Sequence, residues 1–422
     1  MTDLERRLRD TYAERLDALE FSMGDVAGAR RTGARMRTRR RWAVGAAAAA
    51  VVAVAIGSSL VGTGRISVGP SHSTGDWREL PAAPLSPRGY SLAVWTGHEV
   101  IVLGGQETPC PPNADCAVAA EDLRDGAAYD PDAGNWRKVA TAPVSVGSGD
   151  RLVQVGDQVV LRHWFQGGSD WYVYDPRADR WSPMLGVPEH AGDLPSAVGS
   201  DLYVLAGRRV ARYSAVTGRW NLLPPDPLTP RLVGRRVTAT SSGVVVTGVD
   251  ATAPSGGDKP SPIIADAYDT SSDAQVPPRW RRLPTTGQVA NNMWSWTGTR
   301  MVDPEPYELD GGQVNNWGHS YPDGGILDPR SGAWKPLPDA LVDPPDGGSE
   351  WSLSAAGGTW FAVGGLAYDD DTGRVYTIER PDRSLSYATS AAWADRRLLV
   401  FGGATFDKGG PKVTNRAWLW TP

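Results

Sequence analysis

Cysteine and histidine are scarce in this chain, which has two cysteines and five histidines among 422 residues. The histidines are scattered along the sequence, and both cysteines fall in one loop, CPPNADC, as Cys110 and Cys116. A structural zinc site needs four clustered nitrogen or sulfur ligands, so this distribution argues against one. The ligand spacing of an EF-hand is also missing, which argues against that kind of calcium site. We therefore expect no metal and no other cofactor.

A bond between the two cysteines is a simpler explanation for their presence. They lie six positions apart in a loop rich in Pro, Asn and Asp, which allows a small disulfide between Cys110 and Cys116. Such a bond requires an oxidising compartment, and the alternative is two free thiols.

Basic charge is lacking over most of the chain. The net charge is −5, but residues 1–41 contain eleven Arg against seven Asp and Glu, so the remainder carries −9. A large acidic region argues against nucleic acid as its partner.

Only one long apolar run is present, WAVGAAAAAVVAVAIGSSLVG at 42–62. As a helix it would extend about 31 Å, enough to cross a bilayer core. The basic stretch at 30–41 precedes it, and the positive-inside rule then places residues 1–41 in the cytoplasm and the rest outside. We predict a single-pass membrane protein with a cytoplasmic segment 1–41, a transmembrane helix 42–62, a linker 63–75 and an extracytoplasmic domain 76–422. The alternative is a cleaved signal peptide, with AVA at 53–55 as the cleavage site, and it also exports the domain.

Residues 3–21, DLERRLRDTYAERLDALEF, carry apolar side chains at helical spacing and predict an amphipathic helix. The segment resembles the leader that precedes the membrane span of actinobacterial anti-sigma-like proteins, although the His and Cys pattern of the zinc-type members is absent. The resemblance implies a cytoplasmic protein partner for helix 3–21. A helix without a partner is the alternative.

A nine-residue phrase recurs along the domain, as AYDPDAGNW at 128–136, VYDPRADRW at 173–181, RYSAVTGRW at 212–220 and ILDPRSGAW at 326–334. An apolar start, a short polar turn and a Trp predict a strand, a tight turn and a strand. A repeat of about 50 residues is typical of a β-propeller. We expect the Trp to pack between neighbouring blades rather than to bind a ligand.

Residues 76–422 resemble bacterial kelch-type propellers of the galactose-oxidase kind, in which an apolar strand ends in Gly-Gly. Such pairs occur at Gly104–Gly105, Gly364–Gly365 and Gly402–Gly403. Seven inner hairpins predict an all-β fold of seven blades, with six and eight as alternatives. The strand DWREL at 76–80 has no blade of its own, so we predict that it pairs with the last strand, within 415–422, and closes the ring.

Long connections between the second and third strands of four blades predict one decorated face, where binding residues usually lie. The richest insertion is 303–325, beside the segment NNMWSW at 291–296. Aromatic, carboxylate and amide groups together suit a sugar or another polar ligand. A polar loop that packs only on itself is the alternative. The predicted ligand-binding residues are Asn292, Trp294, Asp303, Glu305, Tyr307, Trp317, His319 and Tyr321.

The resemblance to galactose oxidase would imply a copper site with two Tyr and two His, one Tyr being cross-linked to Cys. The adjacent Tyr-His pair of that family is missing here, which argues against a copper oxidase. We expect instead a membrane-anchored, extracytoplasmic binding module for a glycan, peptide or protein. The alternatives are a signalling protein with a cytoplasmic partner and a sugar-processing enzyme of the kelch type.

Overall fold

The computed structural model describes residues 73–111, 121–192, 194–227, 232–250, 263–270, 278–284, 294–303, 309–310, 320–321, 325–337, 353–363, 365–382, 387–407 and 410–422. The chain divides into two compact units, Met1–Val68 and Gly69–Pro422, and all described residues belong to the second. The predicted helix 3–21 and the predicted span 42–62 lie outside the described residues. No helix among the described residues is long and apolar enough to cross a membrane.

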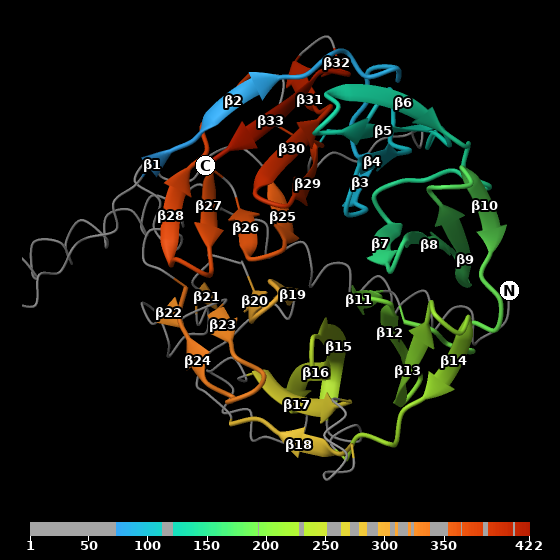
Figure 1. The fold of residues 1–422 in the computed structure, drawn as a ribbon, viewed down its shortest axis with the longest axis vertical. Helices are drawn as coiled ribbons and strands as arrows, with labels where there is room; N and C mark the ends of the chain where they lie inside the picture. Colours follow the sequence, from blue (N-terminus) through green and yellow to red (C-terminus); the bar gives the residue numbers. More distant parts are fainter. Residues whose placement is uncertain are drawn as a thin grey trace, which may run out of the picture. The chain divides into compact units, whose positions relative to one another are not determined.

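All regular elements of the described residues are β-strands, which confirms the all-β prediction. Seven four-stranded antiparallel sheets form the blades of a propeller in the unit Gly69–Pro422 (Figure 1), and one of them gains a fifth strand. The predicted number of seven blades is therefore confirmed.

Blades 1 to 6 run from an inner to an outer strand in chain order, and blade 7 takes its outer strand from the start of the domain. Blades 1 and 2 are β3 (Leu92–Trp95), β4 (Val100–Leu103), β5 (Gly126–Asp130) and β6 (Asn135–Val139), then β7 (Arg151–Val155), β8 (Gln158–Phe165), β9 (Gly168–Asp175) and β10 (Arg180–Pro183). Blades 3 and 4 are β11 (Ser196–Val198), β12 (Asp201–Ala206), β13 (Arg209–Ser214) and β14 (Arg219–Leu222), then β15 (Leu232–Thr240), β16 (Gly243–Asp250), β17 (Ile263–Asp269) and β18 (Trp280–Arg282). Blades 5 and 6 are β19 (Ser295–Trp296), β20 (Met301–Asp303), β23 (Gly325–Leu327) and β24 (Trp334–Lys335), then β25 (Ser354–Gly357), β26 (Trp360–Val363), β27 (Leu366–Asp369) and β28 (Arg374–Thr377). Blade 7 is β29 (Ser390–Ala394), β30 (Arg397–Phe401), β33 (Ala417–Thr421) and β2 (Asp76–Glu79).

Strand β2 closes the ring. It precedes all other strands of blade 7 in the sequence, yet it pairs with β33, the last strand of the chain. It runs antiparallel to β33, with Trp77 opposite Trp420. The predicted closure is therefore confirmed. The structure adds a short strand, β1 (Ser73–Thr74), which pairs in parallel with β28 as the fifth strand of blade 6. These two residues fall within the predicted linker 63–75.

The recurring phrase forms a turn between the third and fourth strands of a blade. The carboxylate of Asp130 accepts hydrogen bonds from the backbone N–H groups of Asp132 and Ala133, at 2.8 and 2.9 Å. Gly134 then adopts a φ of +72°, which lets the chain re-enter the sheet. The same carboxylate-to-backbone bonds begin the turns at Asp175 and Asp328.

The Trp of the phrase packs between blades, as predicted. Trp181 lies opposite Tyr174 across β9 and β10, with ring centroids 5.0 Å apart. Its Nε1 donates to the backbone oxygen of Ala140, in the segment that links blades 1 and 2.

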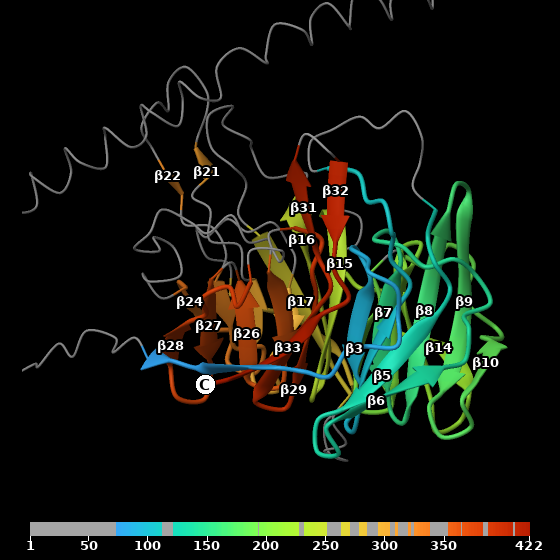
Figure 2. The same ribbon diagram turned by 90° about the horizontal axis from the view of Figure 1, so that it is seen from above.

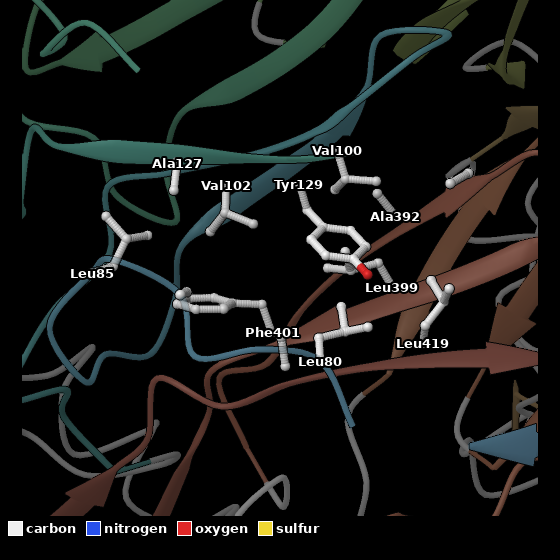
Figure 3. Packing of buried hydrophobic residues seen from close by; sticks show 13 residues of the cluster. Leu80, Leu85, Val100, Val102, Ala127, Tyr129, Ala392, Leu399, Phe401 and Leu419 are labelled. Carbon is white, nitrogen blue, oxygen red and sulfur yellow. The ribbon is translucent and has the colours of Figure 1, made fainter. Parts of the chain in front are cut away.

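The core consists of apolar layers between neighbouring blades. Figure 3 shows the layer that joins β4 and β5 of blade 1 to β30 and β33 of blade 7, with Tyr129 and Phe401 at its centre. Because a blade has a neighbour on both sides, its middle strands are apolar at successive positions rather than at alternate ones, as in β4, whose VIVL is buried throughout.

The two faces of the ring differ. Turns between first and second strands are tight, whereas several connections between second and third strands are long. Two of those connections form hairpins of their own, β21 (Leu309–Asp310) with β22 (Ser320–Tyr321), and β31 (Ala404–Asp407) with β32 (Gly410–Val413). Figure 2 shows both hairpins on the same side of the propeller. We call this side, which carries the connections between second and third strands, the loop face.

Candidate binding face

Most of the predicted ligand-binding residues lie outside the described part of the chain. These are Asn292, Glu305, Tyr307, Trp317 and His319. Tyr321 belongs to β22, so the backbone of this residue is part of a hairpin on the loop face. Their role in ligand binding stays a prediction.

Trp294 packs in the core between blades 4 and 5. It is 9% exposed, and its ring meets the edge of Trp334 at 5.4 Å and 75°. Its Nε1 has no hydrogen-bond partner. Asp303 ends β20 and is fully buried. For both residues the structure describes a buried position, and a contact with a ligand stays a prediction.

The Gly-Gly pairs lie at the ends of second strands, on the loop face, and shape the backbone there. At Gly104 and Gly105 φ is +68° and +94°, and the Gly105 N–H donates to the oxygen of Val146 at 2.9 Å. A Cβ at Gly104 would lie 2.2 Å from that same oxygen, so a side chain would push the linking segment away. At the second described pair, Gly403 donates to the oxygen of Arg88. These glycines let the segment that links two blades lie directly against the strand end.

A buried arginine fixes the long connection of blade 1. Arg88 is 1% exposed, and its two terminal nitrogens reach both carboxylate oxygens of Asp125 at 2.6 and 3.1 Å. It also donates to Ser86 and to the backbone oxygen of Gly104. The hydrogen bond from Arg88 holds the pKa of Asp125 below its ordinary range, although partial burial of the carboxyl opposes the shift.

The predicted disulfide partner Cys116 lies outside the described residues. The disulfide stays a prediction, and the backbone oxygen of Cys110 accepts a hydrogen bond from the Tyr90 hydroxyl at 3.4 Å. Tyr90 has a φ of +57°, which is unusual for a residue with a side chain. Burial raises the pKa of the Tyr90 hydroxyl.

The loop face of blade 2 carries a projecting hairpin that the sequence prediction missed. The pairing of β8 with β9 continues to Phe165 and Gly168, whereas β7 pairs with β8 only up to Arg162 and β10 with β9 only up to Tyr172. We call residues 163–170, which extend beyond both flanking strands, the β8–β9 tip.

The β8–β9 tip exposes two neighbouring aromatic residues, Trp164 (53% exposed) and Phe165 (42%). Below them lies the buried carboxylate of Asp150, with its Oδ1 3.1 Å from Nδ1 of His163. The His163 and Phe165 rings are 6.4 Å apart and tilted by 36°. The alternation of LRHWF and the turn residues QGG would have been the signal for this longer hairpin.

No group of three or more His, Cys, Asp or Glu side chains among the described residues is arranged to hold a metal ion. His98, His163 and His190 lie at separate places in blades 1 and 2 and in the segment that follows blade 2. The arrangement that the structure does provide is a rigid ring with one elaborated face, which suits recognition of another molecule.

No protein-family model and no curated protein sequence matches the chain. A solved structure described as "Structure of YjhT" is similar to it at 12% sequence identity, over 60% of this chain and 85% of that one. The TM-score is 0.36, so the fold assignment rests on the strand pairing described above.

Proposed function

We propose that this protein is a binding module that recognises a glycan, peptide or protein through the loop face of its propeller. The observation that carries the proposal is the asymmetry of the ring. The loop face bears the hairpins β21–β22 and β31–β32 and the β8–β9 tip, whereas the first turn of each blade, on the opposite side, is tight. Elaboration of one face of a rigid scaffold is typical of binding proteins.

The scaffold supports this role because it holds the loop face without the help of a ligand. Arg88 and the glycine pairs fix the strand ends on that face. A preorganised surface loses little conformational entropy on binding.

The experiment is a glycan and peptide array probed with the full purified chain. Two variants identify the face. The first replaces residues 404–413 by a short Gly-containing turn and so removes β31–β32, and the second changes Val216, an 80% exposed residue of a turn on the opposite side. The proposal requires that binding falls in the first variant and not in the second. Retention of binding by the first and loss by the second would contradict the choice of the loop face, and an array without any bound ligand would contradict the proposal.

We also propose that residues 42–62 anchor the protein in the cell membrane, with residues 1–41 in the cytoplasm and the propeller outside. The support is the apolar run and its basic flank. Protease treatment of intact cells tests it, since a protected fragment that contains residues 1–41 is expected. Complete digestion or complete protection would contradict this orientation.

A further inference from the structure

We propose that the β8–β9 tip (residues 163–170) is the site by which the loop face binds a protein partner, one with an apolar pocket and hydrogen-bond donors or basic groups at its rim. The inference rests on the proposed function and makes it specific. It names one hairpin as the anchor of the interface and a protein as the ligand.

The first support is the exposure of two large aromatic side chains at consecutive positions of β8, which project from opposite faces of the hairpin. Trp164 and Phe165 are the only aromatic residues among the large hydrophobic side chains that the described residues leave exposed. Because about half of each residue is already covered, a partner that covered the rest would bury on the order of 100 Å² on each. Aromatic anchors of this kind account for most of the energy of many protein interfaces.

The second support is that the β8–β9 tip is held in one position. Oδ1 of the buried Asp150 accepts the backbone N–H of Trp164 at 2.7 Å, and Oδ2 accepts that of Gly147 at 2.8 Å. One carboxylate therefore joins the projecting part of β8 to the segment that enters β7. An anchor fixed in this way loses little freedom when a partner covers it.

The third support is the orientation of His163. Because the Asp150 carboxylate is an acceptor, Nδ1 of His163 must donate the proton at 3.1 Å. In the neutral ring Nε2 is then an acceptor, and the side chain is 23% exposed beside Phe165. The exposed carboxylate of Asp170, which faces His163 across the hairpin, adds further acceptors. These acceptors lie on the same face of the hairpin as Phe165 and favour hydrogen-bond donors or cations on the partner there.

The shape of the hairpin favours a protein over a small ligand. Sites for small molecules are concave and enclose most of the ligand. The β8–β9 tip projects beyond both neighbouring strands (Figure 2), so the partner must supply the pocket. A lipid surface suits it less, because residues 163–170 contain Asp170 and no Lys or Arg.

The test uses a phage-displayed library of random disulfide-looped peptides, panned on the full chain in nanodiscs. We expect enriched peptides that combine an aromatic or aliphatic residue with Arg or Lys. Their binding should weaken at least tenfold in Trp164→Ser/Phe165→Ser and severalfold in His163→Ala. It should not change in Leu222→Ser, a matched loss of a 50% exposed apolar residue on β14. Circular dichroism and the melting temperature must show that each variant folds.

The alternative outcomes separate the two proposals. Enriched peptides that bind the double variant as tightly as the native chain would overturn the role of the β8–β9 tip while leaving a peptide-binding module in place. A library without enrichment would overturn the choice of a protein partner, and the array would then decide the proposed function. Capture of separate POPC and POPG vesicles by the chain held in nanodiscs, if lost in the double variant, would assign the tip to lipid and would overturn the proposal as well.

Discussion

The indole Nε1 of Trp136 lies 2.9 Å from the backbone oxygen of Pro81, a residue 55 positions earlier in the chain. Trp136 belongs to the outer strand of blade 1, and Pro81 lies just after the outer strand of blade 7. The same bond joins each pair of neighbouring blades where the phrase keeps its Trp in this position. It is made by Trp77, Trp181, Trp280 and Trp334 to the backbone oxygens of Glu379, Ala140, Pro224 and Pro284. Trp220 is the exception, since its buried Nε1 has no partner.

Trp220 therefore serves as an internal control for how much the indole hydrogen bond contributes to stability. Trp136→Phe removes the donor and keeps an aromatic ring. We expect the lost hydrogen bond to lower the free energy of unfolding by about 0.5–1.5 kcal/mol, and the smaller ring adds a cost of its own. Trp220→Phe loses the same volume but removes an N–H that is buried without a partner, and should cost less than Trp136→Phe. Chemical denaturation of both variants measures the difference. Equal losses would show that the ring volume alone matters.

The ion pair of the buried Arg88 with Asp125 should contribute more to stability than a pair on the surface. Arg88→Leu removes the donor to the half-exposed Asp125 carboxylate and one of the two side-chain donors to the Gly104 carbonyl, which keeps the Ser91 hydroxyl at 3.0 Å, and we expect a loss of about 1–3 kcal/mol. Arg177→Leu breaks a pair with Asp157 in which both side chains are more than 70% exposed, and little change is expected. Melting temperatures of the two variants provide the comparison, and similar values would contradict the assignment.

Two carboxyl groups meet between blades 3 and 4. Burial raises the pKa of Asp266 to about 7, assisted by the charge of Asp226 and by a hydrogen bond with it, while Arg282 opposes the shift from 3.3 Å away. Arg235 faces Asp226 at 3.7 Å, and its own pKa is lowered by burial and by Arg208, which lies nearby. The folded protein therefore keeps a proton on Asp266 that the unfolded chain, with the ordinary pKa of 3.8, has released at neutral pH.

This retained proton predicts a decrease of stability with rising pH. Between about pH 4 and pH 7 the folded state binds more protons than the unfolded state at Asp266, so the free energy of unfolding falls through this window and levels off above it. The contribution of Asp266 is on the order of 2–4 kcal/mol. Asp266→Asn should remove it, because an amide does not titrate. Urea denaturation of both proteins at several pH values gives the difference curve, and a flat difference would contradict the shifted pKa.

The blades could be predicted from the sequence because their signals are local. The phrase AYDPDAGNW contains its own turn, as the bonds of Asp130 show, and the fourth strand DWREL was identified because the last blade lacked one. The strand β1 was not predicted, because two residues paired in parallel with β28 leave no pattern in the sequence.

The site was harder to predict, because its contacts join residues that are distant in the sequence. Trp294, in the segment beside the predicted insertion, and Asp303, at its start, were predicted to bind a ligand, yet Trp294 packs against Trp334 from a later strand and Asp303 is fully buried. Asp150 orients His163 thirteen positions later, and only the pairing of β7 with β8 brings the two together. The lengths of the connections identified the loop face, but the distances within it depend on how the blades pack.

The cysteine prediction remains open to a direct chemical test. If Cys110 and Cys116 form a disulfide, iodoacetamide should modify neither cysteine in the denatured protein before reduction and both after it. Mass spectrometry of the peptide that contains residues 110–116 distinguishes these cases. Modification of both cysteines without reduction would show two free thiols, which is the alternative that the sequence allows.

The closure of the ring predicts the largest effect of a single Trp. Trp420 of β33 is fully buried and lies opposite Trp77 of the closing strand β2, with the rings of Trp360 and Trp393 at 6.4 and 6.1 Å. Trp420→Ala opens a cavity where blades 6 and 7 meet β2, and we expect a loss of about 3–5 kcal/mol. The same substitution at the exposed Trp164 should change stability by no more than about 0.5 kcal/mol. Denaturation curves of the two variants test this, and comparable losses would mean that the closing strand contributes less to the ring than its burial indicates.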